Sequence, residues 1–112
     1  MKMMITGEKR MDLLQIAKKK KVLIVAHRGV CGGNIPCNSM PAFKAAVLAG
    51  ADMIELDVDR SADGELFIQH PGMEYVHLRM HDSIKNYPAY MVEQLHLSNW
   101  DLTETQYPIL RL

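Results

Sequence analysis

The chain has few of the features that would assign it to a special class. It has only two cysteines, and its 13 Lys and Arg residues balance its 13 Asp and Glu residues in a length of 112. Balanced charge argues against broad binding to nucleic acid. The longest strongly apolar run, 22–26, is far too short to span a membrane. No stretch of the first twenty residues has the pattern of a signal peptide, so we expect a cytoplasmic protein.

The two cysteines, Cys31 and Cys37, lie six residues apart in a segment rich in glycine and asparagine. No histidine or further cysteine stands around them at zinc-finger spacing. We therefore expect free thiols in a reducing compartment.

The apolar pattern predicts an α/β protein. It predicts helices over 11–19, 40–49 and 88–95, and strands over 22–26, 52–59 and 66–69, with irregular structure over 71–87 and weak periodicity after 99. Asn38 or Ser39 is expected to cap the second helix, and Gly50 to end it. The order strand, helix, strand over 22–59 is a βαβ unit, so its strands should be parallel. The continuous first run is typical of a strand buried on both faces.

The step from Asp59 to Leu66 is too short for a parallel crossover, so these strands should form an antiparallel hairpin. A two-residue loop in the turn at 61–64 would place His70 opposite Glu55 or Asp57, on the acidic face. A three-residue loop would place His70 opposite Leu56, on the apolar face.

Glu55 and Asp57 form the first chemical signal. Two residues apart on a strand, they point the same way at a spacing of about 6–7 Å. Carboxylates that close repel each other unless a positive group lies between them. A hard divalent cation with oxygen ligands would satisfy both. The alternative is a solvated strand face.

His27, Arg28 and Gly29 form the second signal. They lie where the first strand runs into a loop, which is where α/β sheets place their sites. Arg28 has the planar fork of donors that binds phosphate, and Gly29 lets backbone approach a ligand. The remaining histidines and two acidic residues are interpreted as solvated surface or loop residues: His77, His81, His96, Asp82 and Asp101.

These motifs occur together in one order with tight spacing: His27-Arg28-Gly29, Asn38 with Ala42-Phe43, the segment 50–58, Asp63-Gly64 and His70. In this the chain resembles the N-terminal part of the glycerophosphodiester phosphodiesterase family, most strongly over 22–72. The resemblance implies that 1–112 is a partial domain of that family. The implied fold is the N-terminal portion of a TIM-type (β/α)8 barrel, about three strands of it, incomplete in 112 residues. A whole barrel takes about 250 residues. We therefore expect either a truncated reading frame or another chain that supplies the rest.

The resemblance also implies an activity and a set of roles. Family members hydrolyse glycerophosphodiesters to glycerol phosphate and an alcohol with a divalent cation, usually calcium or magnesium. His27 and His70 match the two catalytic histidines, and Arg28 matches the phosphate-contacting arginine. Glu55 and Asp57 match two metal-binding carboxylates. Either histidine can be the base, and the attacking oxygen can come from water or from a neighbouring hydroxyl of the substrate.

Three departures from the family pattern support a second hypothesis. Cys37 replaces the glutamate of the usual Pro-Glu-Asn, Pro71 replaces an aspartate after the second histidine, and the third metal carboxylate of the family lies on a later strand. Five later acids lack supporting spacing for that role: Glu74, Asp82, Glu93, Asp101 and Glu104. The alternative is therefore a non-catalytic remnant that binds phosphate or metal weakly or depends on a partner. An open barrel edge should also make the chain marginally stable or self-associating.

Overall fold

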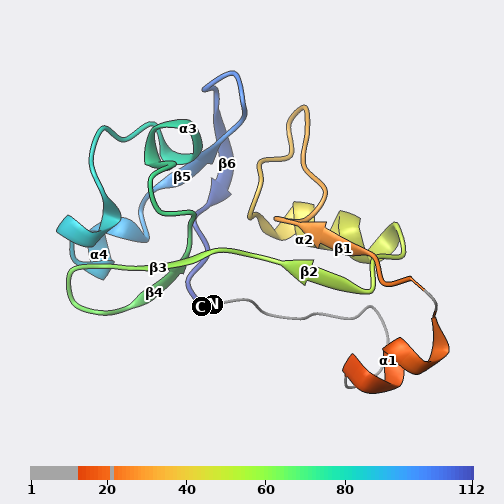
Figure 1. The fold of residues 1–112 in the computed structure, drawn as a ribbon. Coiled ribbons are helices and arrows are strands. Elements are labelled where there is room, and N and C mark those ends of the chain that lie inside the picture. The colour runs from red at the N-terminus through yellow and green to blue at the C-terminus, as the bar shows by residue number, and fades with distance from the viewer. Residues whose placement is uncertain (1–12, 21) are drawn as a thin grey trace.

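The computed structural model describes residues 13–20 and 22–112, and Figure 1 shows their arrangement. The elements in chain order are α1 Leu13–Lys19, β1 Val25–His27, α2 Met40–Leu48, β2 Met53–Glu55, β3 Val58–Arg60, β4 Leu66–Ile68, α3 Glu74–Leu78, the 3-10 helix η1 Ile84–Asn86, α4 Ala89–Val92, β5 His96–Ser98 and β6 Glu104–Pro108. Within the described ranges the strands pair two by two, β1 with β2, β3 with β4, and β5 with β6. The mixed α/β class is confirmed. Residues 11–12 of the predicted first helix lie outside the described residues.

The βαβ unit has the predicted parallel pairing. Val25, Ala26 and His27 lie opposite Met53, Ile54 and Glu55. Helix α2 packs beside these strands (Figure 1) and buries Phe43 and Ala46 against Ile54 and Leu56.

The ends of α2 follow the predicted chemistry. Ser39, rather than Asn38, caps the helix, since its hydroxyl oxygen accepts the backbone N–H of Ala42 at 3.2 Å. Gly50 takes the left-handed backbone conformation (φ +90°) that ends a helix. Asp52 then fastens the start of β2 by accepting the backbone N–H of Ile24 at 2.8 Å and pairing with Lys20. These two interactions hold the pKa of Asp52 below its usual value.

The predicted strand over 22–26 is displaced and less buried than expected. Strand β1 begins only at Val25, and Val22 and Ile24 are 73% and 58% exposed. Within the described residues β1 pairs on one edge only, with β2. A strand is buried on both faces only when further strands and helices surround it. This β1 lacks such neighbours in the described part of the chain.

The predicted strand over 52–59 is two strands with different partners. Strand β2 ends at Glu55 in the parallel pair with β1, and β3 begins at Val58 in the antiparallel pair with β4. The backbone N–H of Arg28 donates to the Glu55 carbonyl at 2.7 Å, and that of Gln69 donates to the Asp57 carbonyl at 3.1 Å. The chain therefore changes partner between these two carboxylates.

The hairpin is antiparallel as predicted, but its loop has three residues. Ser61 donates its N–H to the Glu65 carbonyl at 2.9 Å, and Val58 lies opposite Ile68. Gly64 has φ +88°, which allows the type I turn with a following left-handed residue that is usual for such loops. The two-residue loops are therefore wrong, and the paired register ends at Val58 and Ile68, before His70.

The segments after His70 hold more structure than predicted. Helix α3 and η1 lie in the stretch expected to be irregular, and β5 and β6 pair as a hairpin in the tail. Their apolar side chains form one core: Phe67, Leu78, Ile84, Ala89, Val92, Leu97 and Ile109. The second core contains Phe43, Ala46, Ile54, Leu56 and Ile68. Strand β4 joins the two cores, because its successive residues Phe67 and Ile68 face opposite ways.

The expectation of free thiols is wrong, because Cys31 and Cys37 form a disulfide. The loop folds back on itself through a bridge between Gly32 and Ile35, which brings the two Cα atoms to 5.0 Å, inside the usual range for a disulfide. Disulfides are rare in a reducing compartment. The cytoplasmic location stays a prediction, and the cysteines no longer support it.

Among residues 13–20 and 22–112 the longest helix, α2, has nine residues, so none of the described helices can span a bilayer.

Candidate active site

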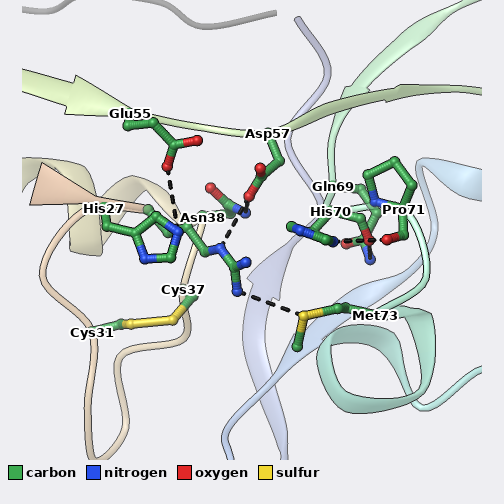
Figure 2. Close-up of polar contacts among 11 residues, drawn as sticks. His27, Cys31, Cys37, Asn38, Glu55, Asp57, Gln69, His70, Pro71 and Met73 are labelled. Atoms are coloured by element: carbon green, nitrogen blue, oxygen red, sulfur yellow. Dashed lines mark hydrogen bonds and ion pairs between the residues drawn. A yellow bond between two sulfur atoms is a disulfide. The ribbon is translucent and has the colours of Figure 1, made fainter.

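The parallel ladder places His27 beside Glu55. These residues lie opposite each other at the ends of β1 and β2, with His27 Nε2 3.6 Å from Glu55 Oε2 (Figure 2). The His27 side chain is 70% exposed, whereas the Glu55 side chain is 15% exposed. The pair therefore presents an accessible imidazole backed by a largely buried carboxylate.

Arg28, the next residue after His27, forms a second pair with Asp57, which lies two residues after Glu55. Arg28 Nε lies 3.1 Å from Asp57 Oδ2, and both side chains are mostly buried. The guanidinium also donates from Nη1 to the sulfur of Met73 at 3.7 Å. Sulfur is a weak acceptor, so a phosphate oxygen would be a stronger partner for this donor.

The backbone conformation of Arg28 brings its side chain to the Asp57 carboxylate. On a regular strand consecutive side chains point to opposite faces, so His27 and Arg28 would diverge. Arg28 has φ +59°, a left-handed conformation that non-glycine residues seldom adopt. This turn lets two consecutive residues reach two carboxylates that lie two residues apart. Strained backbone of this kind often marks a functional position.

Asn38 is a member of this cluster that the sequence indicated as a possible helix cap and as part of the family motif, with no site role assigned. Its side chain is buried, and its Nδ2 donates to Asp57 Oδ2 at 3.2 Å. Its backbone N–H donates to the Arg28 carbonyl at 3.0 Å. The signals in the sequence for this role are its position just before a capping serine, in the loop that follows Arg28, and its place in the family motif.

Gly29 allows the loop to pack closely on α2. A Cβ atom built on Gly29 would lie 2.6–2.8 Å from the backbone and Cβ of Ala42, and φ is +83°. Val30 then donates its N–H to the Ala42 carbonyl at 2.9 Å. The sequence interpretation of Gly29 as a site of close approach therefore applies to helix packing.

His70 lies at the other side of the cluster from His27. Figure 2 shows it beside Gln69 and Pro71, on the Asp57 side of the close-up. Its polar contact is local, between ring Nδ1 and the Pro71 carbonyl at 2.7 Å. The ion pairs thus join His27, Arg28, Glu55 and Asp57, whereas His70 lies near that group without contributing a contact to it among the described residues.

His77 is buried, contrary to its interpretation as a surface or loop residue. It is 4% exposed in α3, its ring packs edge-on against Trp100, and both ring nitrogens lack a hydrogen-bond partner within the described residues. Burial, and to a smaller extent the charges of Arg28 and His70, lowers the pKa of His77 from 6.5 to about 4. The helix that the sequence pattern missed explains this burial.

The carboxylate pair can be tested for its fit to a divalent cation. Glu55 Oε2 is buried and has no hydrogen-bond partner in the described residues, so it has an acceptor free for a ligand. Oxygen donors suit calcium and magnesium. Within 13–20 and 22–112, no three His, Cys, Asp or Glu side chains gather closely enough to hold a metal ion. Glu55 and Asp57 therefore fit a cation that keeps most of its shell as water.

The five later acids have other surroundings. Asp82 and Asp101 bond within their own turns, Glu93 pairs with Arg111, and Glu104 pairs with Arg79. Glu74 is buried in the first turn of α3. The structure brings none of them to the carboxylate pair.

Comparison with known proteins gives a family and a fold. A model of the glycerophosphoryl diester phosphodiesterase family matches residues 27–110. The chain is 50% identical over 50 residues to a glycerophosphodiester phosphodiesterase of Caldanaerobacter subterraneus subsp. tengcongensis. This match covers 45% of this chain and 20% of that protein. It is 40% identical over 60 residues to a lysophospholipase D of Rattus norvegicus, which covers 52% of this chain and 19% of that protein.

Solved structures agree. A glycerophosphodiester phosphodiesterase from Agrobacterium tumefaciens superposes with a TM-score of 0.71 at 30% identity, covering 81% of this chain and 39% of that one. A glycerophosphoryl diester phosphodiesterase from Parabacteroides distasonis superposes with a TM-score of 0.72 at 23% identity, covering 80% and 32%. The predicted TIM-type fold class is confirmed. The chain spans about a fifth of the length of the curated relatives that it matches.

Replacing Gly29 should test the close packing of the loop on α2. We expect Gly29→Ala to lower the free energy of unfolding by about 2–5 kcal/mol, since the new methyl group meets helix backbone in a left-handed conformation. Gly72→Ala is the matched control. Its φ is +86°, nothing lies within 4 Å of the added atom, and the cost should be about 1–2 kcal/mol. Equal losses in denaturant unfolding would contradict this account.

His77 should make stability depend on pH. Its folded pKa of about 4 lies below its ordinary 6.5, so the unfolded chain takes up the proton first as pH falls. The stability that depends on neutral His77 is fully present above about pH 6.5. As pH falls to about 4 it is lost, and the free energy of unfolding decreases by about 2–3 kcal/mol. Urea unfolding of the wild type and of His77→Phe across this range measures it. Parallel pH curves for the two proteins would refute the assignment.

Proposed function

The chain belongs to the glycerophosphoryl diester phosphodiesterase family, and on that premise we propose that it carries part of a site for metal-assisted hydrolysis of glycerophosphodiesters. The products are glycerol phosphate and an alcohol. The observation that carries this proposal is the double pairing at the ends of β1 and β2, His27 with Glu55 and Arg28 with Asp57. These pairs bring together an accessible imidazole, an arginine guanidinium of the kind that binds phosphate, and two carboxylates.

Each residue has a role in this proposal. Arg28 holds a non-bridging phosphate oxygen through its guanidinium. One of His27 and His70 takes the proton from the attacking oxygen of water or of a neighbouring substrate hydroxyl, and the other gives a proton to the leaving alcohol. Glu55 and Asp57 would hold calcium or magnesium, which neutralises charge on the phosphate when bound.

The remaining barrel strands belong to the proposal as well. The part that superposes is 32% and 39% of the two solved relatives, and β1 keeps one edge unpaired within the described residues. We propose that further polypeptide completes the barrel wall, either on the same chain or on another. Self-association through the β1 edge is one way to cover it.

A second candidate function has its own support. The described residues supply two carboxylates and no third metal-binding group, and Arg28 is already engaged by Asp57. A non-catalytic module that binds phosphate or a cation weakly would need no more than this.

Calcium titration by calorimetry tests the cation site. We expect the wild-type chain to bind calcium with a dissociation constant of about 10⁻⁴–10⁻³ M, since two carboxylates leave most of the shell to water. Glu55→Gln should weaken binding at least about tenfold, because it removes one of the two charged ligands. The control is Glu104→Gln, which removes an exposed carboxylate paired with Arg79. Equal affinity in wild type and Glu55→Gln would remove the cation from the proposal.

Hydrolysis by the chain alone should be very weak or absent. Positioning and preorganised charge provide most of the acceleration in phosphoryl transfer, and the strands of the described residues form three separate pairs rather than a closed barrel. The assay uses glycerophosphocholine and glycerophosphoethanolamine with calcium or magnesium, and sedimentation gives the mass in solution. Fast turnover by a stable monomer, abolished in His27→Ala, would show that no further polypeptide is needed. Cation binding without turnover, even after association, would favour the second candidate.

A further inference from the structure

Asn38 occupies a position in which its side chain serves neither the helix nor the turn. Its backbone is left-handed (φ +57°) and its side chain is 1% exposed. Ser39 caps α2 and also donates its hydroxyl to the Pro36 carbonyl at 2.6 Å. Glycine would adopt the Asn38 backbone conformation without strain. The local fold therefore does not require an amide at this position.

The side chain of Asn38 is also poorly satisfied. Its Oδ1 is buried and has no hydrogen-bond partner among the described residues, which is a cost that a stabilising residue would avoid. Its Nδ2 makes one contact, with Asp57 Oδ2. An argument from stability alone therefore predicts that removing this side chain is neutral or favourable.

Asn38 contacts both members of the buried ion pair. Its amide donates to Asp57 Oδ2, the same oxygen that lies 3.1 Å from Arg28 Nε, and its backbone N–H donates to the Arg28 carbonyl. The Asn38 amide is thus the hydrogen-bond donor on Oδ2, with the Arg28 charge beside it, and the other oxygen of Asp57 is left for a ligand. The amide thus selects one orientation of the carboxylate.

The preceding residue is fixed covalently. Cys37 is buried and bonded to Cys31, which closes the loop between Arg28 and Asn38. Asn34 in the same loop accepts from the Asn99 amide at 3.3 Å and so connects it to the β5–β6 hairpin. Asn38 therefore approaches Asp57 from a loop held at both ends.

We propose that Asn38 is a positioning residue that orients the Asp57 carboxylate toward a divalent cation and keeps Arg28 beside it. This inference rests on the proposed function for the cation, while the orientation of Asp57 and Arg28 is a property of the protein alone. Hydrogen-bond partners of metal-ligating carboxylates change metal affinity by about 10–100-fold when they are removed. Loss of the amide should therefore reduce calcium affinity by about tenfold.

The test compares Asn38→Gly with the wild-type chain under non-reducing conditions. Glycine keeps the backbone conformation and removes only the amide. The matched control is Leu102→Gly, which places glycine at another left-handed position (φ +68°), in the turn between β5 and β6. Three measurements are made on each protein: calcium titration, urea unfolding without calcium, and the NMR signal of the Arg28 Nε–H, identified by its absence in Arg28→Lys.

The expected result separates positioning from stability. Asn38→Gly should bind calcium about tenfold more weakly and exchange the Arg28 Nε–H at least about tenfold faster, while its unfolding midpoint stays at or above the wild-type value. Leu102→Gly should leave calcium affinity and the Arg28 signal unchanged.

Two results would overturn the proposal, and one would separate it from the proposed function. An unchanged Arg28 signal with unchanged calcium affinity would show that Asn38 positions nothing. A fall in the unfolding midpoint that accounts for the loss of affinity would give Asn38 a structural role only. A faster Arg28 exchange in a protein whose wild type binds no calcium would support the positioning of Asp57 and Arg28 and refute the cation site instead.

Discussion

The change of strand partner between Glu55 and Asp57 is the constraint on which the rest of the structure depends. Up to Glu55 the chain pairs with β1, and from Asp57 onward it pairs with the hairpin strand β4. The parallel pair needs α2 as its crossover, and the hairpin needs a tight turn, so one short segment joins two different kinds of local structure. The carboxylates of the candidate site lie on either side of this junction, which is why His27 and Arg28 can each reach one of them.

The same junction divides the core. Phe67 faces the core formed with α3, α4 and the β5–β6 hairpin, whereas Ile68 faces the core formed with α2 and β2. Strand β4 thus ties together two small clusters that would each be marginal alone. Asp59 is buried opposite Phe67 on β3, and Lys85 pairs with it at 3.4 Å. A displacement of either core cluster would therefore move the segment between β2 and β3 that carries Asp57.

Local patterns predicted much of this arrangement, and long-range contacts account for what they missed. The apolar run, the capping serine and the spacing of 22–59 were enough for a parallel βαβ unit, since a crossover of that length leaves few alternatives. The hairpin was predictable, but its register depended on a loop of two or three residues, which Ala62-Asp63-Gly64 does not decide. The disulfide, the burial of His77 and the β5–β6 pairing arise from contacts between distant or irregular segments, which periodicity does not report. Asn38 was visible as a potential cap and as part of the family motif, but its contact with Asp57 depends on where Asp57 lies in space.

The ion pair between Arg28 and Asp57 joins two roles that the family resemblance keeps separate. Glu55 and Asp57 repel each other unless positive charge is near, and here the Arg28 guanidinium supplies that charge from within the protein. On the proposed function, a cation at Asp57 would take over this neutralisation, and the guanidinium would then be free to bind a phosphate oxygen in place of Asp57 and of the weak Met73 sulfur. The metal ion and the phosphodiester would in that case bind cooperatively. A metal ion on Asp57 frees Arg28 for the phosphate, and a phosphate on Arg28 frees Asp57 for the metal ion. By this argument the ion pair neutralises Asp57 in the folded chain when neither ligand is bound.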